Sequence, residues 1–397
     1  MAVLNLGTYP PKQCGIATFS MDLRNSLLIH GNEVKVMAVS EEKNKYEYPP
    51  EVVFEIDRQH RPDYFAAASF INSAADVELV IIQHEYGIFG GMDGEYIMDL
   101  VGMLLKPYVL VTHTVLPNPT RSCKNILNYL AGRASAVVSM TRNSMMLMSD
   151  LYEAPPELIY LIAHGVPEFK VQDSDLLKNK YGLQGRDIIS TFGLIGPGKG
   201  LELGIEAVAG LTEDYPRIIY LILGRTHPML VEYEGEKYRH MLETMVSRLG
   251  IEDNVRFVNK YLSNEELGEY LYMTDIYLSP YPNKDQAVSG TMAFAVGCGR
   301  AIVSTPYSYA AETLAEGRGL VANQADPWEL ADLMEEILQN PALKQDLQRK
   351  AWKLGKNWTW PSVGRQYTDM FNSMLDVDSG LLWKDRNLSY ANLPTFS

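Results

Sequence analysis

The chain has 397 residues, of which 46% are hydrophobic and 21% are charged. This composition is that of an ordinary globular protein and argues against long disorder or a fibrous repeat, and the length favours two or three domains. The net charge of −14 argues against a general nucleic-acid binder, which neutralises phosphates with cationic side chains, but it leaves room for a local basic pocket that holds one nucleotide.

The cysteines and the chain start give expectations about location. Cys14, Cys123 and Cys298 are widely spaced and odd in number, so no disulfide framework or zinc-ligand spacing is visible, which favours a reducing compartment. The N-terminal residues lack the pattern of a signal peptide, and no window approaches roughly 18 uninterrupted apolar residues. We expect a cytoplasmic protein without a membrane span, with peripheral membrane contact left open and no oligomeric state predicted.

The first part of the chain alternates short apolar runs with helical stretches. A helix over 16–30 is predicted because Ile16, Phe19, Leu23 and Leu27 recur at helical spacing. The apolar runs predict strands at 2–6, 34–39, 79–83, 108–112, 136–139 and 158–162. This alternation predicts a mainly parallel sheet with helices on both faces.

A second series of the same kind follows a polar stretch, 168–186, which we interpret as a linker. Its predicted strands are 187–192, 218–223, 255–258, 276–279 and 301–304. The sequence therefore predicts two Rossmann-like domains. The expected division is 1–167, 168–355 and a helical tail at 356–397.

Helices are expected from about 326 to 376, toward the end of the chain. Asp326 precedes Pro327 and Asn340 precedes Pro341, and both pairs are typical of a helix start. An apolar face follows, made of Trp358, Trp360, Tyr367 and Phe371. We expect this face to pack on the N-terminal domain.

Residues that follow each strand are the candidates for binding, because ligands of open α/β sheets lie beyond the carboxyl ends of the strands. Gly15 opens a helix whose free N–H groups suit an anion or sugar hydroxyls, with a plain turn as the alternative. The run 84–91 suits a sugar or acceptor pocket, unless His84 is structural. His113 directly follows a strand, and a buried, satisfied histidine is the alternative. His164 lies at the expected domain junction and is a further candidate, with a hinge that contains a capping histidine as the alternative.

In the second series, the glycine-rich run 193–200 follows a strand and opens a helix. Its glycines permit close backbone approach and Lys199 adds a positive charge, which suits a diphosphate, although no Walker A pattern is present. Arg225 is a second candidate cation unless it is a solvated surface residue. The run 289–291 gives a small-residue helix start, and Glu312 is a candidate for ribose hydroxyls or a surface glutamate.

The joint order of these segments resembles the retaining GT-B glycosyltransferases of glycosyltransferase family 4. The resemblance to that family's second domain is carried by 191–208, 250–267, 274–281 and 289–321, and the resemblance to its acceptor domain by 7–23, 112–114 and 164–167. It implies two Rossmann-like domains with parallel sheets facing a cleft and a C-terminal helix that returns to the first domain. It also implies transfer of a hexose from a nucleotide sugar to a hydroxyl acceptor with retention of configuration.

The sequence departs from that family's pattern in two places. The arginine that usually accompanies the phosphate lysine is Leu194 here, while Lys199 remains. Two glutamates before and within the glycine-rich helix fall on Gln286 and Phe294, with Asp285 beside the first. Arg225 offers a replacement positive charge. These departures indicate a divergent subgroup.

The resemblance implies a role for each candidate. The diphosphate would lie against Lys199, Arg225 and the 289–291 backbone, which would stabilise charge on the leaving group without a metal ion or a cofactor. The catalytic candidates are His113, Lys199, Asp285 and Gln286. The donor-binding candidates are Gly196, Gly198, Lys199, Arg225, Ser289, Gly290, Thr291 and Glu312. The acceptor-binding candidates are Gln13, Gly15, His84, Glu85 and Tyr86.

Within this interpretation, GDP-mannose is the expected donor and UDP-glucose the next choice, with a carbohydrate or another hydroxyl compound as acceptor. Two other functions suit the same architecture: a glycoside phosphorylase, with phosphate beside Lys199, and a non-catalytic sugar- or nucleotide-binding protein. A sugar-nucleotide epimerase is disfavoured because residues 1–20 lack a dinucleotide fingerprint.

Overall fold

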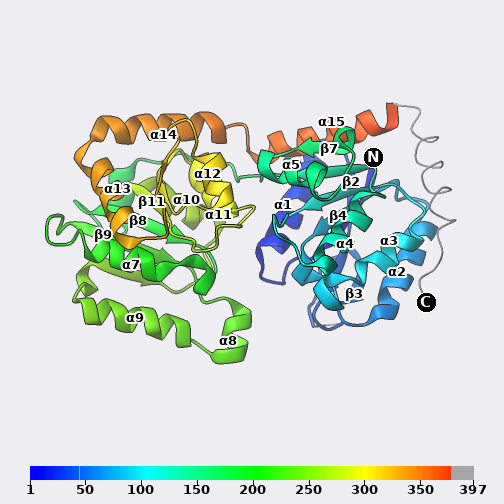
Figure 1. Cartoon of the computed structure of the whole chain (residues 1–397), viewed down its shortest axis with the longest axis horizontal. Helices are drawn as coiled ribbons and strands as arrows, with labels where there is room; N and C mark the ends of the chain where they lie inside the picture. Colours follow the sequence, from blue (N-terminus) through cyan, green and yellow to red (C-terminus); the bar gives the residue numbers. More distant parts are fainter. Residues whose placement is uncertain (44, 377–397) are drawn as a thin grey trace. The chain divides into compact units, whose positions relative to one another are not determined.

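A computed structural model describes residues 1–43 and 45–376 (Figure 1). The described residues form two compact units: unit 1 contains Met1–Gly165 and Trp360–Asp376, and unit 2 is Val166–Thr359. The divisions thus fall at 165/166 and 359/360, whereas the sequence placed them at 167/168 and 355/356. Residues 377–397 of the predicted tail lie outside the described residues.

Unit 1 is built on a seven-stranded parallel sheet with the order β3-β2-β1-β4-β5-β6-β7. Its strands are β1 (Ala2–Gly7), β2 (Glu33–Ser40), β3 (Val52–Asp57), β4 (Leu79–His84), β5 (Tyr108–Thr112), β6 (Ala136–Ser139) and β7 (Ile159–Leu161). Its helices are α1 (Gly15–Ile29), α2 (Arg61–Ser73), α3 (Ile97–Met103), α4 (Arg121–Ala131), α5 (Arg142–Asp150) and α15 (Trp360–Asp376).

Unit 2 has a six-stranded parallel sheet with the order β10-β9-β8-β11-β12-β13. Its strands are β8 (Asp187–Phe192), β9 (Ile218–Leu223), β10 (Val255–Val258), β11 (Ile276–Ser279), β12 (Ala301–Ser304) and β13 (Leu320–Val321). Its helices are α6 (Ser174–Lys180), α7 (Leu201–Ala209), α8 (Pro228–Glu234), α9 (Lys237–Leu249), α10 (Asn264–Met273), α11 (Gly290–Gly297), α12 (Ser308–Thr313), α13 (Pro327–Gln339) and α14 (Pro341–Gly355).

The two sheets share one strand order. In each, the chain builds outward in one direction and then reverses, between β1 and β4 in unit 1 and between β8 and β11 in unit 2. This is the order of a Rossmann fold, and ligands of such sheets lie beyond the carboxyl ends of the strands at the reversal point. The predicted architecture of two Rossmann-like units with parallel sheets is therefore confirmed.

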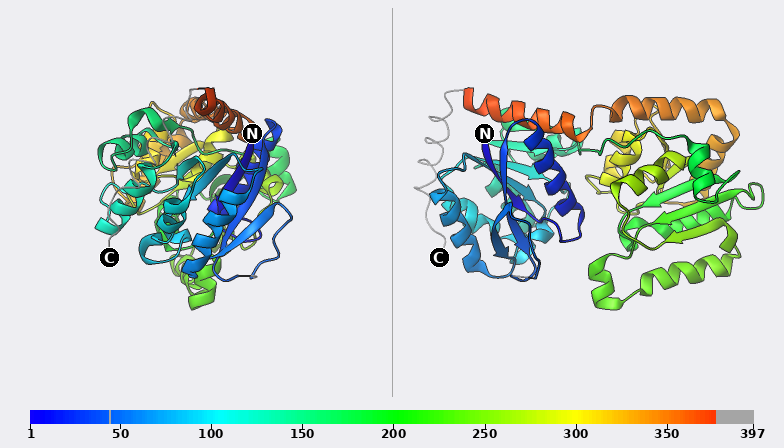
Figure 2. Two further views of the ribbon diagram at one scale, coloured as in Figure 1. Left: turned by 90° about the vertical axis from the view of Figure 1, so that its right-hand side faces the viewer. Right: turned by 180° about the vertical axis from the view of Figure 1, so that it is seen from behind.

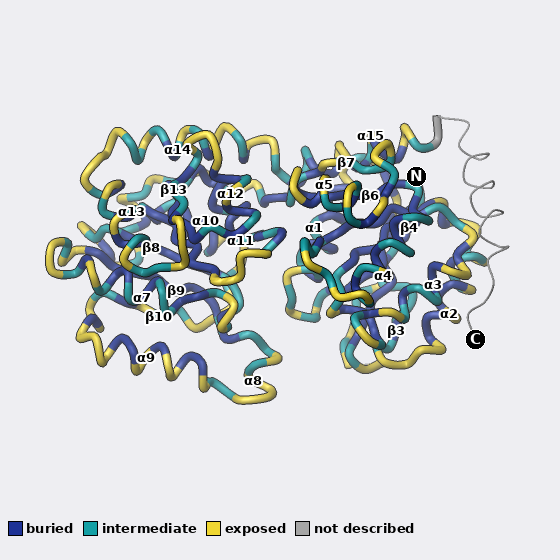
Figure 3. The backbone as a smooth tube through the Cα atoms, in the orientation of Figure 1, coloured by how far each residue is buried: buried dark blue, intermediate teal, exposed yellow. Residues whose placement is uncertain are grey.

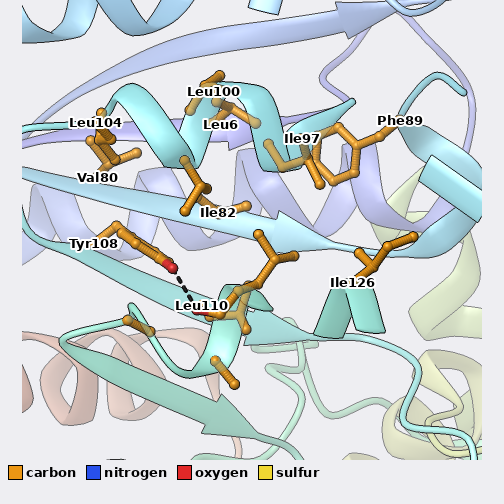
Figure 4. Close-up of a cluster of buried hydrophobic side chains, with 14 of the residues drawn as sticks. Leu6, Val80, Ile82, Phe89, Ile97, Leu100, Leu104, Tyr108, Leu110 and Ile126 are labelled. Atoms are coloured by element: carbon orange, nitrogen blue, oxygen red, sulfur yellow. Dashed lines mark hydrogen bonds between the residues drawn. The ribbon is translucent and has the colours of Figure 1, made fainter. Parts of the chain in front are cut away.

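The central strands of both sheets are deeply buried, as the tube in Figure 3 shows. Parallel strands covered on both faces need apolar side chains on both, which explains why these segments are continuous apolar runs. Figure 4 shows part of the unit 1 core, where Leu6 of β1 and Ile82 of β4 lie in one cluster with Leu100 of α3. Unit 2 has two such clusters.

The prediction of a linker at 168–186 is wrong. This stretch contains α6 and belongs to unit 2, where α6 packs on α10. Its apolar side chains Leu177 and Leu183 are 4% and 2% exposed in the core of that unit. Polar residues surround these two leucines, so the average polarity of the segment suggested a linker although the segment is amphipathic.

The predicted helical tail forms α13, α14 and α15. Asp326 and Asn340 cap α13 and α14 with their side chains, as expected. Helix α15 returns to unit 1 and packs along α1 (Figure 2). Asn32, in the turn after α1, donates a hydrogen bond of 2.9 Å to Thr368 of α15. Trp358 departs from the prediction, because it packs in the core of unit 2 and not with α15. Among the described residues, we find no helix with the length and apolarity to cross a bilayer.

Candidate functional site

Lys199 lies in the loop that joins β8 to α7, beyond the carboxyl end of β8. The side chain is half-buried, and its Nζ donates a hydrogen bond of 2.6 Å to the hydroxyl of Tyr281. The ammonium also lies 4.4 Å from the centroid of the Tyr281 ring. Tyr281 follows β11, the strand next to β8, so the pair is located at the reversal point of the unit 2 sheet.

A hydroxyl network extends from this pair to the start of α11. The hydroxyls of Tyr281 and Thr291 are 2.7 Å apart, and Thr291 Oγ1 lies 3.2 Å from Ser289 Oγ. Ser289 caps the helix, because its Oγ accepts a hydrogen bond from the backbone N–H of Met292. The network therefore joins Lys199, Ser289 and Thr291, which the sequence assigned to one donor site.

Two glycines shape the loop around Lys199. Gly193 has a φ of +131°, and a Cβ there would lie 3.3 Å from Thr291 Cγ2 and 3.5 Å from Lys199 Nζ. Gly200 has a φ of +60°, and a Cβ there would lie 2.1 Å from the carbonyl oxygen of Pro280. Both backbone conformations favour glycine, so these positions let the loop approach the segment after β11 closely.

The positive charge of Lys199 changes the acidity of its neighbours. Burial acts to raise the pKa of Tyr281, but the charge and hydrogen bond of Lys199, with hydrogen bonds from Thr291 and Ser289, outweigh it and lower that pKa. Burial and then the charge of Lys199 lower the pKa of His227, at the start of α8. Lys199 thus places a positive charge at this end of the sheet, which favours an anionic ligand.

The other donor candidates of this loop region lie around the same strand ends. Gly198 is exposed and has open space where a Cβ would stand, whereas Gly196 has Leu230 at 3.0 Å. Gly290 is the first residue of α11. Arg225 follows β9, and its Nε is buried without a hydrogen-bond partner among the residues that the structure describes. A small recess beside Lys199 is lined by 191–195, Leu201 and the end of β9.

The carboxylate and amide candidates occupy the segment from 280 to 289 and α12. Asp285 is exposed, and its backbone N–H donates to Asn283. Gln286 is half-buried, and its side-chain amide donates to the carbonyl of Val288 at 2.7 Å. Glu312 is a half-buried residue of α12. The start of α12 is tied to the 280–289 segment by a hydrogen bond from Tyr309 N to Gln286 O.

In unit 1, His113 follows β5 and heads a chain of buried amides. Its Nε2 lies 2.9 Å from Gln83 Oε1, and Gln83 Nε2 donates to Asn5 Oδ1 at 2.9 Å. Asn5 Nδ2 donates in turn to the backbone carbonyl of Ser20 in α1. Asn5 and Gln83 come from β1 and β4, so this chain lies at the reversal point of the unit 1 sheet.

Three histidines of unit 1 have a lowered pKa. Burial is the main cause in each case, and it brings the pKa to about 3 for His113 and to about 4 for His84 and His164. The charges of His164 and His84 lower the pKa of His113 further. The His113 and His164 rings each pack at a steep angle against the Phe19 ring, at centroid distances of 4.8 and 5.1 Å. These imidazoles are therefore neutral at pH 7.

The predicted acceptor residues differ in their exposure. Gln13 and Gly15 are exposed around the start of α1. Glu85 accepts a hydrogen bond from Thr114, and burial raises its pKa despite that bond. Tyr86 is half-buried and donates to the carbonyl of Cys123. The ring of His84 is 1% exposed, so a contact with a ligand would require the loop after β4 to move.

Sequence reasoning missed Tyr281, Gln83 and Asn5. Tyr281 stands two residues after β11, where reading past the strand end would have found it. Asn5 and Gln83 are polar residues inside otherwise apolar strands, which is a signal in itself because buried polar groups need partners. Their pairing joins residues 78 positions apart, and one sequence does not reveal such a pairing.

The site contains no obvious metal centre. Within 1–43 and 45–376, no three His, Cys, Asp or Glu side chains gather in a way that could hold a metal ion.

The chain matches one family model and several known glycosyltransferases. Residues 173–354 match the family model "Glycosyl transferases group 1". A D-inositol 3-phosphate glycosyltransferase of Nocardioides sp. is 24% identical over 252 residues, 60% of this chain and 53% of the relative. A GDP-mannose-dependent alpha-(1-6)-phosphatidylinositol monomannoside mannosyltransferase of Mycolicibacterium smegmatis is 24% identical over 49% of this chain and 50% of its own length. The chain thus spans about half the length of these two relatives.

Solved structures match over nearly the whole chain. Anabaena HepE in complex with UDP has a TM-score of 0.74 at 15% identity, covering 94% of this chain and 100% of that one. Sucrose-phosphate synthase of Thermosynechococcus elongatus has a TM-score of 0.78 at 16% identity, covering 95% and 100%. Together with the two parallel sheets, these likenesses show that the chain has a GT-B fold, and residues 173–354 of unit 2 match the glycosyl transferases of group 1.

Proposed function

We propose that the protein is a glycosyltransferase that moves a hexose from a nucleotide sugar to a hydroxyl acceptor with retention of configuration. The observation that carries the proposal is the position of Lys199: a half-buried ammonium at the reversal point of the unit 2 sheet, joined through Tyr281 to the start of α11. A positive charge beside the N–H groups of a helix start suits a diphosphate. The match of 173–354 to a glycosyltransferase family supports the same conclusion.

The chemistry required is stabilisation of a leaving group. When the bond between the sugar and the diphosphate breaks, negative charge develops on the diphosphate oxygens, and preorganised positive charge lowers that barrier. Lys199 would supply the charge, with the Arg225 side chain and the Gly290 and Thr291 N–H groups as further donors. In this proposal the protein's own cations perform the task, and neither a metal ion nor another cofactor is required.

The remaining candidates complete the proposal. His113 would contact the transferred hexose, and Asp285 or Gln286 would bind its hydroxyls. Glu312 would accept hydrogen bonds from the ribose. The acceptor would meet Gln13 and the loop after β4. These assignments rest on the position of each residue beyond the carboxyl end of a parallel strand.

The donor is proposed to be GDP-mannose, with UDP-glucose as the alternative. One relative is named as GDP-mannose-dependent, whereas solved structures of HepE hold UDP and UDP-glucose. A thermal-shift titration with GDP, UDP, ADP, their hexose conjugates and phosphate separates the possibilities, because a ligand that binds the folded state raises its stability. A shift with one base names the donor. A shift with phosphate alone favours a phosphorylase.

Replacement of Lys199 tests the mechanism. We expect Lys199→Ala to keep the fold and to lose at least about a hundredfold in turnover, since one preorganised charge at a leaving group contributes about 3 kcal/mol. Lys353→Ala is the matched control, because Lys353 is an exposed lysine of α14. Unchanged turnover in Lys199→Ala would remove Lys199 from the mechanism. The anomeric configuration of the product, read by NMR, tests retention.

A further inference from the structure

The orientation of the amide chain in unit 1 is fixed at its inner end. The backbone carbonyl of Ser20 only accepts hydrogen bonds, so the group of Asn5 that faces it, at 3.3 Å, is the NH₂. Asn5 Oδ1 therefore faces Gln83 and accepts from its NH₂ at 2.9 Å. The remaining atom, Gln83 Oε1, must then face Nε2 of His113 at 2.9 Å.

This order decides which nitrogen of His113 carries the proton. An amide oxygen accepts and does not donate, so the short contact with Gln83 Oε1 requires a hydrogen on Nε2. Burial keeps the pKa of His113 near 3, so the ring is neutral and carries one N–H only. Nδ1 therefore holds a lone pair, and it has no hydrogen-bond partner within the described parts of the chain.

The opposite arrangement is disfavoured for a physical reason. Reversing the three groups would set Asn5 Oδ1 against the carbonyl of Ser20 and leave Gln83 Nε2 pointing at His113. Asn5 and Gln83 are 1% and 0% exposed, so water does not satisfy the mismatched groups. An unpaired buried polar group is costly, and the opposed carbonyls would repel each other as well.

We propose that Asn5 and Gln83 are positioning residues that hold His113 as its Nε2–H tautomer, so that Nδ1 accepts a hydrogen bond from a hydroxyl of the bound hexose. The hexose contact rests on the proposed function, whereas the tautomer does not. Asn5 and Gln83 lie on β1 and β4, the two strands at the reversal point of the sheet, where ligands of such sheets bind. A hydroxyl that donates to Nδ1 is recognised, while a group that only accepts at that place is rejected.

The tautomer is measured directly by NMR. Protein labelled with ¹⁵N in its histidine rings gives distinct resonances for a protonated and an unprotonated ring nitrogen, and His113→Asn identifies the His113 signals. We expect Nε2 protonated and Nδ1 unprotonated at pH 7. Addition of GDP-mannose or UDP-glucose should shift the Nδ1 resonance. A proton on Nδ1 in the unaltered protein would overturn the assignment without any need for a variant.

A variant tests the part played by the amides. Gln83→Met keeps much of the side-chain volume and removes the acceptor, so the His113 ring should become a mixture of tautomers and KM for the donor should rise about tenfold. Gln366→Met, at an exposed glutamine of α15, is the matched control and should change neither reading. If Gln83→Met keeps a single Nε2–H tautomer and the same KM, Gln83 is not a positioning residue.

Failure of this inference is distinguishable from failure of the proposed function. An Nε2–H tautomer that is lost in Gln83→Met, in a protein that neither binds nor turns over any nucleotide sugar, upholds the positioning role and removes the hexose contact. Turnover of a nucleotide sugar by a protein that carries the proton on Nδ1 of His113 would uphold the proposed function and overturn the tautomer assignment.

Discussion

At the scale of single residues, the polar side chains at the sheet reversals are held by defined partners. Tyr281 holds Lys199 and Thr291 together, and Gln83 links His113 to Asn5. In each case a side chain that we propose as a ligand contact is held by a buried partner, Tyr281 or Gln83. Such orientation limits the freedom that a ligand-binding side chain would otherwise lose on binding.

The hydroxyl of Tyr281 is predicted to strengthen nucleotide binding by keeping Lys199 in place. Tyr281→Phe removes the acceptor of the Lys199 hydrogen bond and leaves the aromatic ring. We expect the Kd for GDP or UDP to rise about two- to tenfold, since one hydrogen bond contributes about 0.5–1.5 kcal/mol. Calorimetric titration measures it. Tyr233→Phe, at a tyrosine 80% exposed on α8, should leave Kd unchanged, and equal values for all three proteins would contradict the prediction.

Buried His84 is predicted to weaken the fold in acid. Its ring is 1% exposed, and burial lowers its pKa to about 4, so the unfolded chain binds a proton below pH 6.5 that the folded chain does not. The free energy of unfolding should therefore fall as the pH drops from 7 to 5, by about 2 kcal/mol for this group. Both ring nitrogens also lack a partner in the described structure, so no hydrogen bond is lost in His84→Phe.

Urea unfolding of the parent and of His84→Phe at pH 7 and pH 5 measures this contribution. We expect the variant to lose about 2 kcal/mol less than the parent between these two pH values. Asp22 acts in the opposite direction, because burial raises its pKa to about 6 and favours the folded state in acid. It is present in both proteins, so the comparison cancels it. The same pH dependence in both would show that His84 is protonated equally in the folded and unfolded states.

At the scale of elements, the sequence was most informative where periodicity and caps act locally. The strands at 187–192, 218–223 and 301–304 have the predicted bounds, because each is an apolar run ended by a turn. Strand β3 was missed because most of its residues are only half-buried at the edge of the sheet, which leaves little hydrophobic pattern. Strand β13 has two residues, too few for any pattern.

The sequence predicted some residues of the candidate site but not the partners that hold them. The rule that ligands lie beyond strand ends selected Lys199, His113 and the 289–291 helix start. Lys199 and this helix start follow β8 and β11, the reversal strands of unit 2, whereas His113 follows β5 and contacts Gln83 of β4. Their partners Tyr281 and Gln83 were not selected, since a contact between distant segments depends on strand order. One sequence does not give that order. The roles of all the candidate residues, Asp285, Gln286 and Glu312 included, stay predictions.

The contact between α1 and α15 depends on a glycine. A Cβ at Gly364 would lie 2.0 Å from Ser26 Oγ and 2.9 Å from Ser26 Cβ, so the two helices leave no room for a methyl group there. We expect Gly364→Ala to lower the free energy of unfolding of unit 1 by about 1–3 kcal/mol, the usual cost of overpacking. Gln366→Ala, exposed on the same helix, should have no such effect in thermal unfolding. A variant as stable as the parent would show that the helices separate at little cost.

At the scale of the whole molecule, the two units share a strand order but differ in how the chain builds them. Unit 2 is one continuous segment, whereas unit 1 needs a helix that comes after unit 2 in the chain. Phe371 of α15 is 0% exposed and Tyr367 is 1% exposed, so the returning helix contributes to the buried interior of unit 1.

Loss of that packing should weaken unit 1 alone. Phe371→Ala removes a buried aromatic side chain, which costs about 3–5 kcal/mol. In hydrogen exchange followed by mass spectrometry, we expect faster exchange in α1 and β1 and unchanged exchange in β8 and α7. Trp328→Ala, at a tryptophan 64% exposed on α13, is the control. Faster exchange throughout both units would instead show that they unfold together.

The path of the chain also has a consequence for its synthesis. The ribosome makes Met1–Gly165 first, then the whole of Val166–Thr359, and only afterwards α15. At roughly 5–20 residues per second, synthesis of the intervening residues takes about 10–40 s, and during this time the face of α1 that packs against α15 stays unpacked. Unit 1 therefore starts before unit 2 and is completed after it, and a nascent chain released before Trp360 would contain all of Val166–Thr359 but would lack the last helix of unit 1.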